Sequence, residues 1–303
     1  TAPAVVANRS FAISLMFNGQ FKRAQPYFDR ALDLFDPVLH NDLAQKYGQD
    51  FGVATHGLIS VNLLMLGETR RAIKLVRECE RYAEACGDIT SKCYMHMVAA
   101  YFHLYLHDFA EMERHTRSLT ELVNQYSLSF FGNLAAMFQS LLKVGSGDRT
   151  GLAELKEVDA SLVAANSLGL LTIFRAVAGH RALAMGLNEE ALQFANSTQE
   201  LITQTGEEWY LVDLHRLYAA LATADDDAKG AEQQLNTALD VARKQGAKFS
   251  ELGAAIDLAR LMQEQERTDE AIAILKPVSD SIAEGDCPHD QAMAKELLNV
   301  LTG

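Results

Sequence analysis

The sequence predicts an all-α protein built as a solenoid of helix pairs, and three observations support this. Turn-forming or polar residues recur about every 40 positions between apolar, helix-like stretches, at Gly67, His107, Gly147, Gly186, Asp226 and Glu266. A second series marks the ends of the following stretches at the same period, at Gly87, Ser127, Ser167, Gly206 and Gly246. Finally, 49% of the residues are hydrophobic, only 5 are proline, and strand-like alternation is nearly absent. Repeats of this kind bury their apolar faces against neighbouring repeats.

Each period is expected to hold a first helix, a tight turn, a second helix and a residue that stops it. The first helices are predicted near 5–18, 51–66, 90–106, 129–144, 168–185, 209–224 and 249–264. The second helices are predicted near 22–35, 69–85, 109–125, 151–165, 189–204, 229–244 and 268–283. The first interval, from Gly19 to Gly67, is longer than the others, which predicts an extra short helix at about 39–48. A last apolar stretch at about 289–301 indicates a helix that caps the final repeat.

Small and aromatic residues follow the first turn at helix-face spacing, at Gly19, Ala24, Phe28 and Ala31. This spacing resembles the tetratricopeptide repeat, in which the turn glycine lets two helices pack antiparallel and the alanines allow close approach. The resemblance implies a right-handed superhelical solenoid of about seven helix pairs and a capping helix. We expect it to form a single domain over residues 1–303. Met112 and Leu152 stand where alanine is expected, which predicts looser packing and a pocket in the third and fourth repeats.

Whole-chain properties exclude several classes of partner. The net charge of −13 argues against nucleic acid, because that binding depends on clustered Lys and Arg. No run approaches the roughly 18 apolar residues that cross a bilayer, and no signal sequence opens the chain, so we expect a cytoplasmic protein without membrane contact. The 4 cysteines form no C-x-x-C pair and are expected to be reduced. The chain begins at Thr1 and the first repeat follows almost at once, so we expect a piece of a longer protein.

Several segments carry a more specific resemblance. They are YGQDFGVA at 47–54, GEEWY at 206–210, LHRL at 214–217, ALDVARKQGAK at 238–248, LARL at 258–261 and LKPV at 275–278. These segments resemble the C-terminal repeat region of bacterial multidomain signalling proteins. In that family a class III adenylate or guanylate cyclase domain, or a DNA-binding domain, precedes a signal-transduction ATPase and a tetratricopeptide array. A related array in maltotriose-responsive transcription activators senses a small inducer.

The resemblance implies a non-catalytic regulatory module that senses a ligand or docks a protein. The implied partners are a protein or peptide, upstream domains of the same polypeptide, or a small-molecule inducer, and no cofactor is expected. A purely structural scaffold that assembles homo-oligomers is the alternative, and the residues leave it open. An enzyme is disfavoured, because the sequence contains neither G-x-S-x-G nor G-x-x-x-x-G-K-[ST] and places no base beside an activated nucleophile. We therefore expect no catalytic residues.

First helices usually line the inner side of such arrays. Counting from each turn places Tyr94, Met97, Tyr101, Tyr105, Met137, Leu141, Ile173, His180, Arg216 and Arg260 on that side. Tyrosine offers amphipathic contact area and arginine holds carboxylates, so these residues predict a groove for a peptide or small ligand. The other interpretation is that several of the tyrosines belong to the core between repeats.

Basic residues recur on two second helices. They are Arg70, Lys74, Arg77 and Arg81, with Arg114 and Arg117 at equivalent positions of the next repeat. Stacked repeats would join them into a docking patch for an acidic partner or an upstream domain. The alternative is an ordinary solvated helix face.

Three histidines lie close together on one predicted first helix, at positions 96, 103 and 107. Their spacing lets His96, His103 and His107 face one side. No cysteine or second histidine pair completes a tetrahedral set, and His107 occupies the turn. The sequence therefore predicts no metal site.

Overall fold

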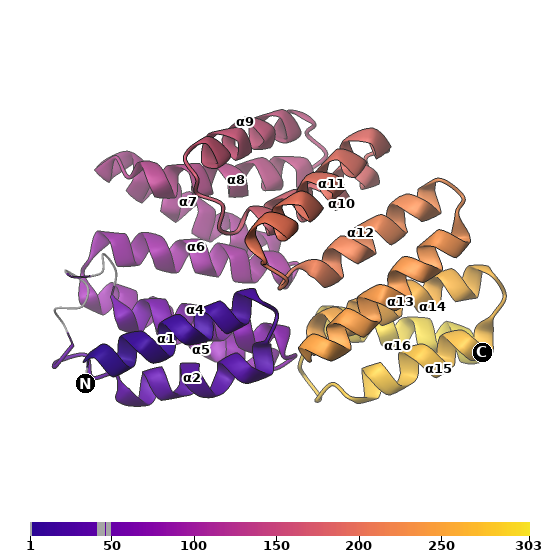
Figure 1. The fold of residues 1–303 in the computed structure, drawn as a ribbon, viewed down its shortest axis with the longest axis horizontal. Coiled ribbons are helices and arrows are strands. Elements are labelled where there is room, and N and C mark those ends of the chain that lie inside the picture. The colour runs from indigo at the N-terminus through magenta and orange to yellow at the C-terminus, as the bar shows by residue number, and fades with distance from the viewer. Residues whose placement is uncertain (1, 41–45, 47–49) are drawn as a thin grey trace. The chain divides into compact units, whose positions relative to one another are not determined.

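The computed structural model describes residues 2–40, 46 and 50–303, and Figure 1 shows these residues as a series of helices. Fifteen α-helices and no strand are present in the described ranges. The extra helix predicted at about 39–48 falls mainly on residues outside those ranges. None of the described helices combines the length and apolar character needed to cross a lipid bilayer.

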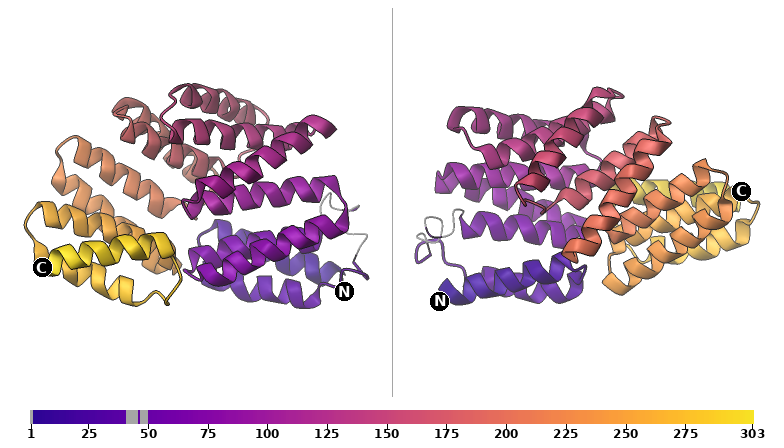
Figure 2. Two further views of the ribbon diagram at one scale, coloured as in Figure 1. Left: turned by 180° about the vertical axis from the view of Figure 1, so that it is seen from behind. Right: turned by 45° about the horizontal axis from the view of Figure 1, so that its top comes forward.

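The helices alternate as predicted. The first helices of the pairs are α1 (Ala2–Phe17), α4 (Phe51–Met65), α6 (Ile89–Tyr105), α8 (Ser129–Gly145), α10 (Leu171–Ala184), α12 (Leu211–Ala224) and α14 (Lys248–Glu264). The second helices are α2 (Phe21–Leu34), α5 (Thr69–Cys86), α7 (Phe109–Tyr126), α9 (Thr150–Ala164), α11 (Asn188–Thr205), α13 (Ala228–Gln245) and α15 (Thr268–Asp280). A last helix, α16 (Pro288–Thr302), occupies the predicted capping position. The all-α repeat fold is confirmed, and Figure 2 shows the helix pairs from two further directions.

Left-handed backbone conformations create the period. Residues of the turn series have positive φ at Gly67, His107, Gly147, Gly186, Asp226 and Glu266. Residues of the helix-stopping series also have positive φ, at Gly87, Ser127, Gly206 and Gly246. At the fourth pair the residue with positive φ is Asn166, at 53°, rather than the predicted Ser167, because asparagine enters this region more readily than serine. A left-handed residue satisfies the last carbonyls of a helix and reverses the chain.

The chain forms two compact units. Unit 1 comprises Thr1–Met16, Lys22–Leu64 and Arg70–Leu168, and unit 2 comprises Phe17–Phe21, Met65–Thr69 and Gly169–Gly303. The boundary at Leu168 follows the fourth helix pair. The single domain over residues 1–303 stays a prediction.

Small residues allow close packing of the helix pairs. The alanines at the repeat position are completely buried, at Ala72, Ala191, Ala231 and Ala271. Met112 and Leu152 are also buried, and looser packing with a pocket in their repeats stays a prediction. Next to Leu152, a Cβ on Gly151 would lie 2.5 Å from the backbone oxygen of Ser140, which shows how closely α9 approaches α8.

Candidate functional site

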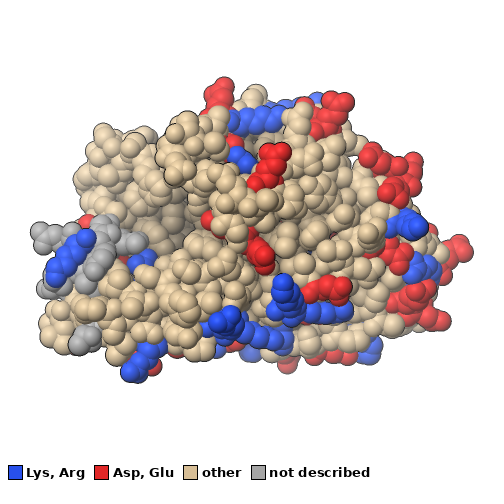
Figure 3. Space-filling view, viewed as in Figure 1, with Lys and Arg blue, Asp and Glu red and all other residues tan. Residues whose placement is uncertain are grey.

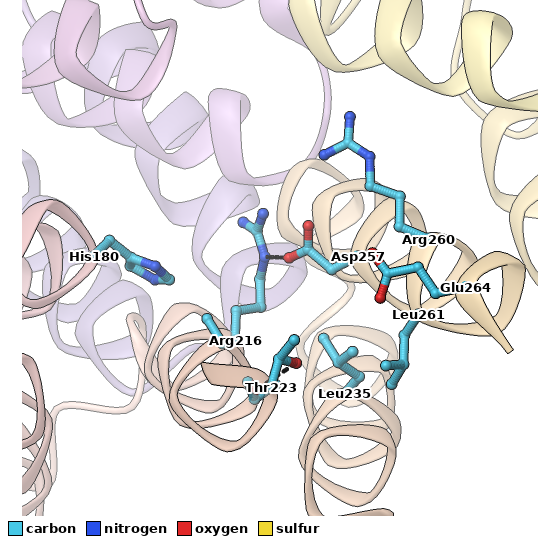
Figure 4. Close-up of a pocket in the computed structure, with 10 residues that line it drawn as sticks. His180, Arg216, Thr223, Leu235, Asp257, Arg260, Leu261 and Glu264 are labelled. Atoms are coloured by element: carbon cyan, nitrogen blue, oxygen red, sulfur yellow. Dashed lines mark hydrogen bonds and ion pairs between the residues drawn. The ribbon is translucent and has the colours of Figure 1, made fainter. Parts of the chain in front are cut away.

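A pocket of about 330 Å³ opens among α10, α12, α13 and α14 of unit 2. We call it the unit 2 pocket. It is lined by His180, Arg216, Ala219, Ala220, Thr223, Leu235, Asp257, Arg260, Leu261 and Glu264. Figure 4 shows His180 and Arg216 on one side and Asp257, Arg260 and Glu264, all from α14, on the other. The structure therefore brings together three of the predicted groove residues, His180, Arg216 and Arg260.

Arg216 is held between two carboxylates. Its Nε donates to Oδ2 of Asp257 on α14 at 2.7 Å, and its Nη1 donates to Oδ1 of Asp213 at 3.1 Å. Burial disfavours the guanidinium charge, but Asp257 and Asp213 outweigh it and raise the pKa of Arg216 above the ordinary arginine value. Arg216 is thus a charged, internally neutralised part of the pocket wall.

A glycine makes room for this arginine. A Cβ on Gly253 of α14 would lie 2.7 Å from Nη1 of Arg216, so the bare backbone lets the guanidinium pack against the helix. His180 lies on the other side, with Nε2 3.3 Å from the backbone oxygen of Asp213. Burial, together with the charge of Arg216, lowers the pKa of His180, so its imidazole is neutral at neutral pH.

Arg260 and Glu264 supply the exposed charges of the pocket. Arg260 donates through Nη2 to the thioether sulphur of Met293 at 3.7 Å, which is a weak acceptor, and no carboxylate in the described ranges pairs with it. Glu264 follows one helical turn later on the same helix and is also exposed. The floor between them is apolar, with Ala219, Leu235 and Leu261. The arrangement can hold a ligand that has an apolar part and a carboxylate.

Apart from Ile173 on α10 of unit 2, which is completely buried, the other predicted groove residues lie in unit 1 and are mostly buried. Met97, Tyr101, Tyr105 and Met137 are at most 8% exposed. Tyr101 donates its hydroxyl proton to the Tyr105 hydroxyl at 3.3 Å, and the two rings pack edge to face. Tyr94, also largely buried, hydrogen-bonds with Arg9. For these residues the structure favours the second interpretation, a packed core.

The predicted docking patch is an exposed surface of α5 and α7. Arg70, Lys74, Arg77 and Arg81 line a shallow surface cavity of about 480 Å³ together with Ile73, Glu78 and Glu80. Glu78 lies 3.9 Å from Lys74 and 3.6 Å from Arg81. Arg114 pairs with Glu80 and Glu111, and Arg117 with Glu113. Acidic groups thus alternate with the basic ones, and Figure 3 shows the same mixing on the face that it displays. Docking of an acidic partner at this patch stays a prediction.

Comparison with known proteins identifies a fold rather than a family. No protein-family model matches the chain, and no curated protein matches it in sequence. Yeast Tom70 is similar in structure, with a TM-score of 0.50, 13% identity and coverage of 93% of this chain and 60% of Tom70. A signal-transduction ATPase with a tetratricopeptide repeat sensor from Pyrococcus horikoshii matches with a TM-score of 0.47, 13% identity and coverage of 98% of this chain and 44% of the other.

The fold is tetratricopeptide-like. The chain spans less than two thirds of the length of either similar protein.

The sequence did not predict the acidic half of the unit 2 pocket. Asp257 comes 41 residues after Arg216, close to one repeat, so the 40-residue period contained a signal for this pair. It also missed His115 on α7, whose ring nitrogen lies 3.0 Å from that of His96.

Proposed function

We propose that the chain is a regulatory binding module, and that the unit 2 pocket receives a short peptide segment that carries a carboxylate. Arg260 carries this proposal. Its guanidinium stands at a solvent-exposed edge of the pocket beside an apolar floor, and the thioether of Met293 is its acceptor in the described ranges. A guanidinium so placed can form two parallel hydrogen bonds with a carboxylate.

The remaining pocket residues support a peptide rather than a simple anion. Glu264 offers an acceptor for the N–H donors of a peptide, and Leu235 and Leu261 offer contact area for an apolar side chain. Arg216 is already paired with Asp213 and Asp257, so it shapes the wall and attracts a second carboxylate weakly. The pocket therefore offers the positive group of Arg260, the negative group of Glu264 and an apolar surface. These features are complementary to the carboxylate, the N–H donors and an apolar side chain of a peptide that contains an acidic residue.

The regulatory part of the proposal rests on the sequence resemblance to repeat regions of bacterial signalling ATPases. In such a protein, a segment bound in the pocket changes the activity of upstream domains only if it binds their active and inactive states with different affinity. The segment can belong to another protein or to an upstream domain of the same polypeptide. We place the chain in the cytoplasm on the same basis.

The test uses fluorescence polarisation with labelled short peptides of mixed sequence that each contain one Asp or Glu. The same peptides with Asn or Gln at that position serve as matched ligands. We expect the acidic peptides to bind more tightly, and Arg260→Ala to weaken their binding about tenfold or more, the effect of losing a charge-assisted pair. Arg243→Ala is the matched control, because Arg243 lies on α13, pairs with Glu251 and does not line the pocket.

Three outcomes would overturn the proposal. Binding that is equal for acidic and amide peptides, or equal for the wild type and Arg260→Ala, would show that Arg260 holds no carboxylate. If no peptide binds, the structural scaffold becomes the better interpretation. Sedimentation analysis would then show whether the chain assembles into oligomers.

A further inference from the structure

Two helices of unit 1 bring three imidazoles together. His96 and His103 lie two turns apart on α6, and His115 lies on α7, which packs against α6. Nδ1 of His96 is 3.0 Å from Nδ1 of His115. The rings of His103 and His115 are stacked, with centroids 5.7 Å apart and an interplanar angle of 17°. His115 is therefore in contact with both other histidines.

Carboxylates complete this cluster. Glu111 precedes His115 by one turn on α7, and one ligand atom each from His103, Glu111 and His115 lie within 4.8 Å of one another. From α5, Oε1 of Glu80 is 3.3 Å from Nε2 of His115. Imidazole nitrogens with a carboxylate oxygen form the donor set that zinc commonly takes in proteins.

The imidazoles of His103 and His115 are shielded from solvent. The side chain of His115 is fully buried, and that of His103 is only 16% exposed. Nδ1 of His103 is buried without a hydrogen bond and lies 3.4 Å from Oδ2 of Asp108.

A positive group already lies among these donors. The guanidinium of Arg114 approaches Nε2 of His115 to 2.8 Å, Oε2 of Glu111 to 2.8 Å and Oε1 of Glu80 to 3.1 Å. Its side chain is 49% exposed, so it can turn outward without crossing the core. The cluster thus favours a positive charge. A metal cation that binds the donor atoms directly can take the place of the Arg114 guanidinium.

We propose that His103, His115 and Glu111 bind a zinc-class divalent ion, and that Arg114 turns away when the ion enters. Their ligand atoms already lie within 4.8 Å of one another, and a water molecule would be the fourth ligand of a tetrahedral ion. Arg114 can only donate to Nε2 of His115, so the proton of this ring is on Nδ1, where it is donated to His96 and orients the ring without having to leave. Such an ion would link α6 to α7, and it is independent of the unit 2 pocket.

The experiment titrates the complete chain, freed of metal with a chelator, with Zn²⁺ in competition with a chromogenic chelator. Co²⁺ serves as the spectroscopic probe, because its visible bands are intense in a tetrahedral site. We expect one equivalent of Zn²⁺, and about tenfold or greater weakening in His103→Gln and His115→Gln. His215→Gln is the matched control, since His215 pairs with Gln234 on α13 outside the cluster. Arg114→Ala is expected to bind the ion more tightly than the wild type.

The gain expected for Arg114→Ala protects the test against misfolding, because a damaged structure does not improve a preorganised site. Far-ultraviolet circular dichroism of each variant shows whether the helices persist. The proposal fails if no stoichiometric Zn²⁺ binds to the folded chain. It also fails if binding survives in both histidine variants, or if His215→Gln weakens it equally.

Discussion

Arg216 on α12 and Asp257 on α14 form an ion pair that joins two successive first helices of unit 2, with 2.7 Å between Nε and Oδ2. The pair depends on Gly253, because a side chain at that position would occupy the space of the guanidinium. It also forms part of the wall of the unit 2 pocket. The same contact therefore serves helix packing and pocket shape.

Arg216→Ala is expected to lower the free energy of unfolding by about 2 kcal/mol, because it leaves Asp213 and Asp257 without their counter-charge in a partly buried site. Urea denaturation followed by circular dichroism measures this loss. Arg243→Ala is the comparison, because Arg243 is 53% exposed and its pair with Glu251 should contribute less than about 1 kcal/mol. Equal losses in the two variants would contradict a structural role for the buried pair.

Gly151→Ala is expected to destabilise unit 1 by about 2 kcal/mol, because the added Cβ would meet a backbone oxygen that cannot move without shifting α8. Gly145→Ala tests the same substitution where no atom lies within 4 Å. There we expect no loss, or a gain of up to about 0.5 kcal/mol from better helix propensity. Relative to the wild type, the denaturation midpoint of Gly151→Ala should fall and that of Gly145→Ala should stay the same or rise slightly. An unchanged midpoint for Gly151→Ala would show that α8 and α9 are less closely packed than the structure indicates.

His180 is expected to make the stability of the protein fall as the pH drops below its ordinary pKa of 6.5. Burial and the charge of Arg216 lower its pKa, while Asp213 and Asp257 partly offset them. Between 6.5 and the lowered value, the unfolded chain binds a proton that the folded chain does not, so stability is lost as pH falls through this window. Denaturation of the wild type and His180→Asn on both sides of pH 6.5 measures the effect. A variant that loses as much stability as the wild type would contradict the assignment.

The helices could be predicted because their signals are local. Residues that enter the left-handed region, such as Gly67 and Gly206, recur at a fixed period and mark each reversal of the chain. The alanines that follow the turns predicted close packing, and Ala231 and Ala271 are indeed completely buried. Asn166 was missed because the period alone does not distinguish it from Ser167, whereas its backbone preference does.

The candidate sites could be predicted only in part, because helix phase gives a direction but no partner. Phase placed His180 and Arg216 on the same side correctly. It also placed Tyr101 on that side, yet it could not show that this side of α6 is core rather than groove. The contact between His96 and His115 depends on how α6 packs against α7, and the spacing of histidines on one helix carries no information about it.

The turn positions give a test of how the repeat is built. Glu266 has φ of 61°, a conformation that costs a residue with a side chain roughly 1 kcal/mol, and its side chain is exposed. Glu266→Gly is therefore expected to raise the free energy of unfolding by up to about 1 kcal/mol. Gly186 is the reciprocal case, since its φ is 74° and a Cβ there would meet no atom within 4 Å. Gly186→Ala should lower stability by about 1 kcal/mol through backbone strain alone. Both changes are measured by urea denaturation. If both variants matched the wild type, the left-handed residues would mark the period without contributing to its stability.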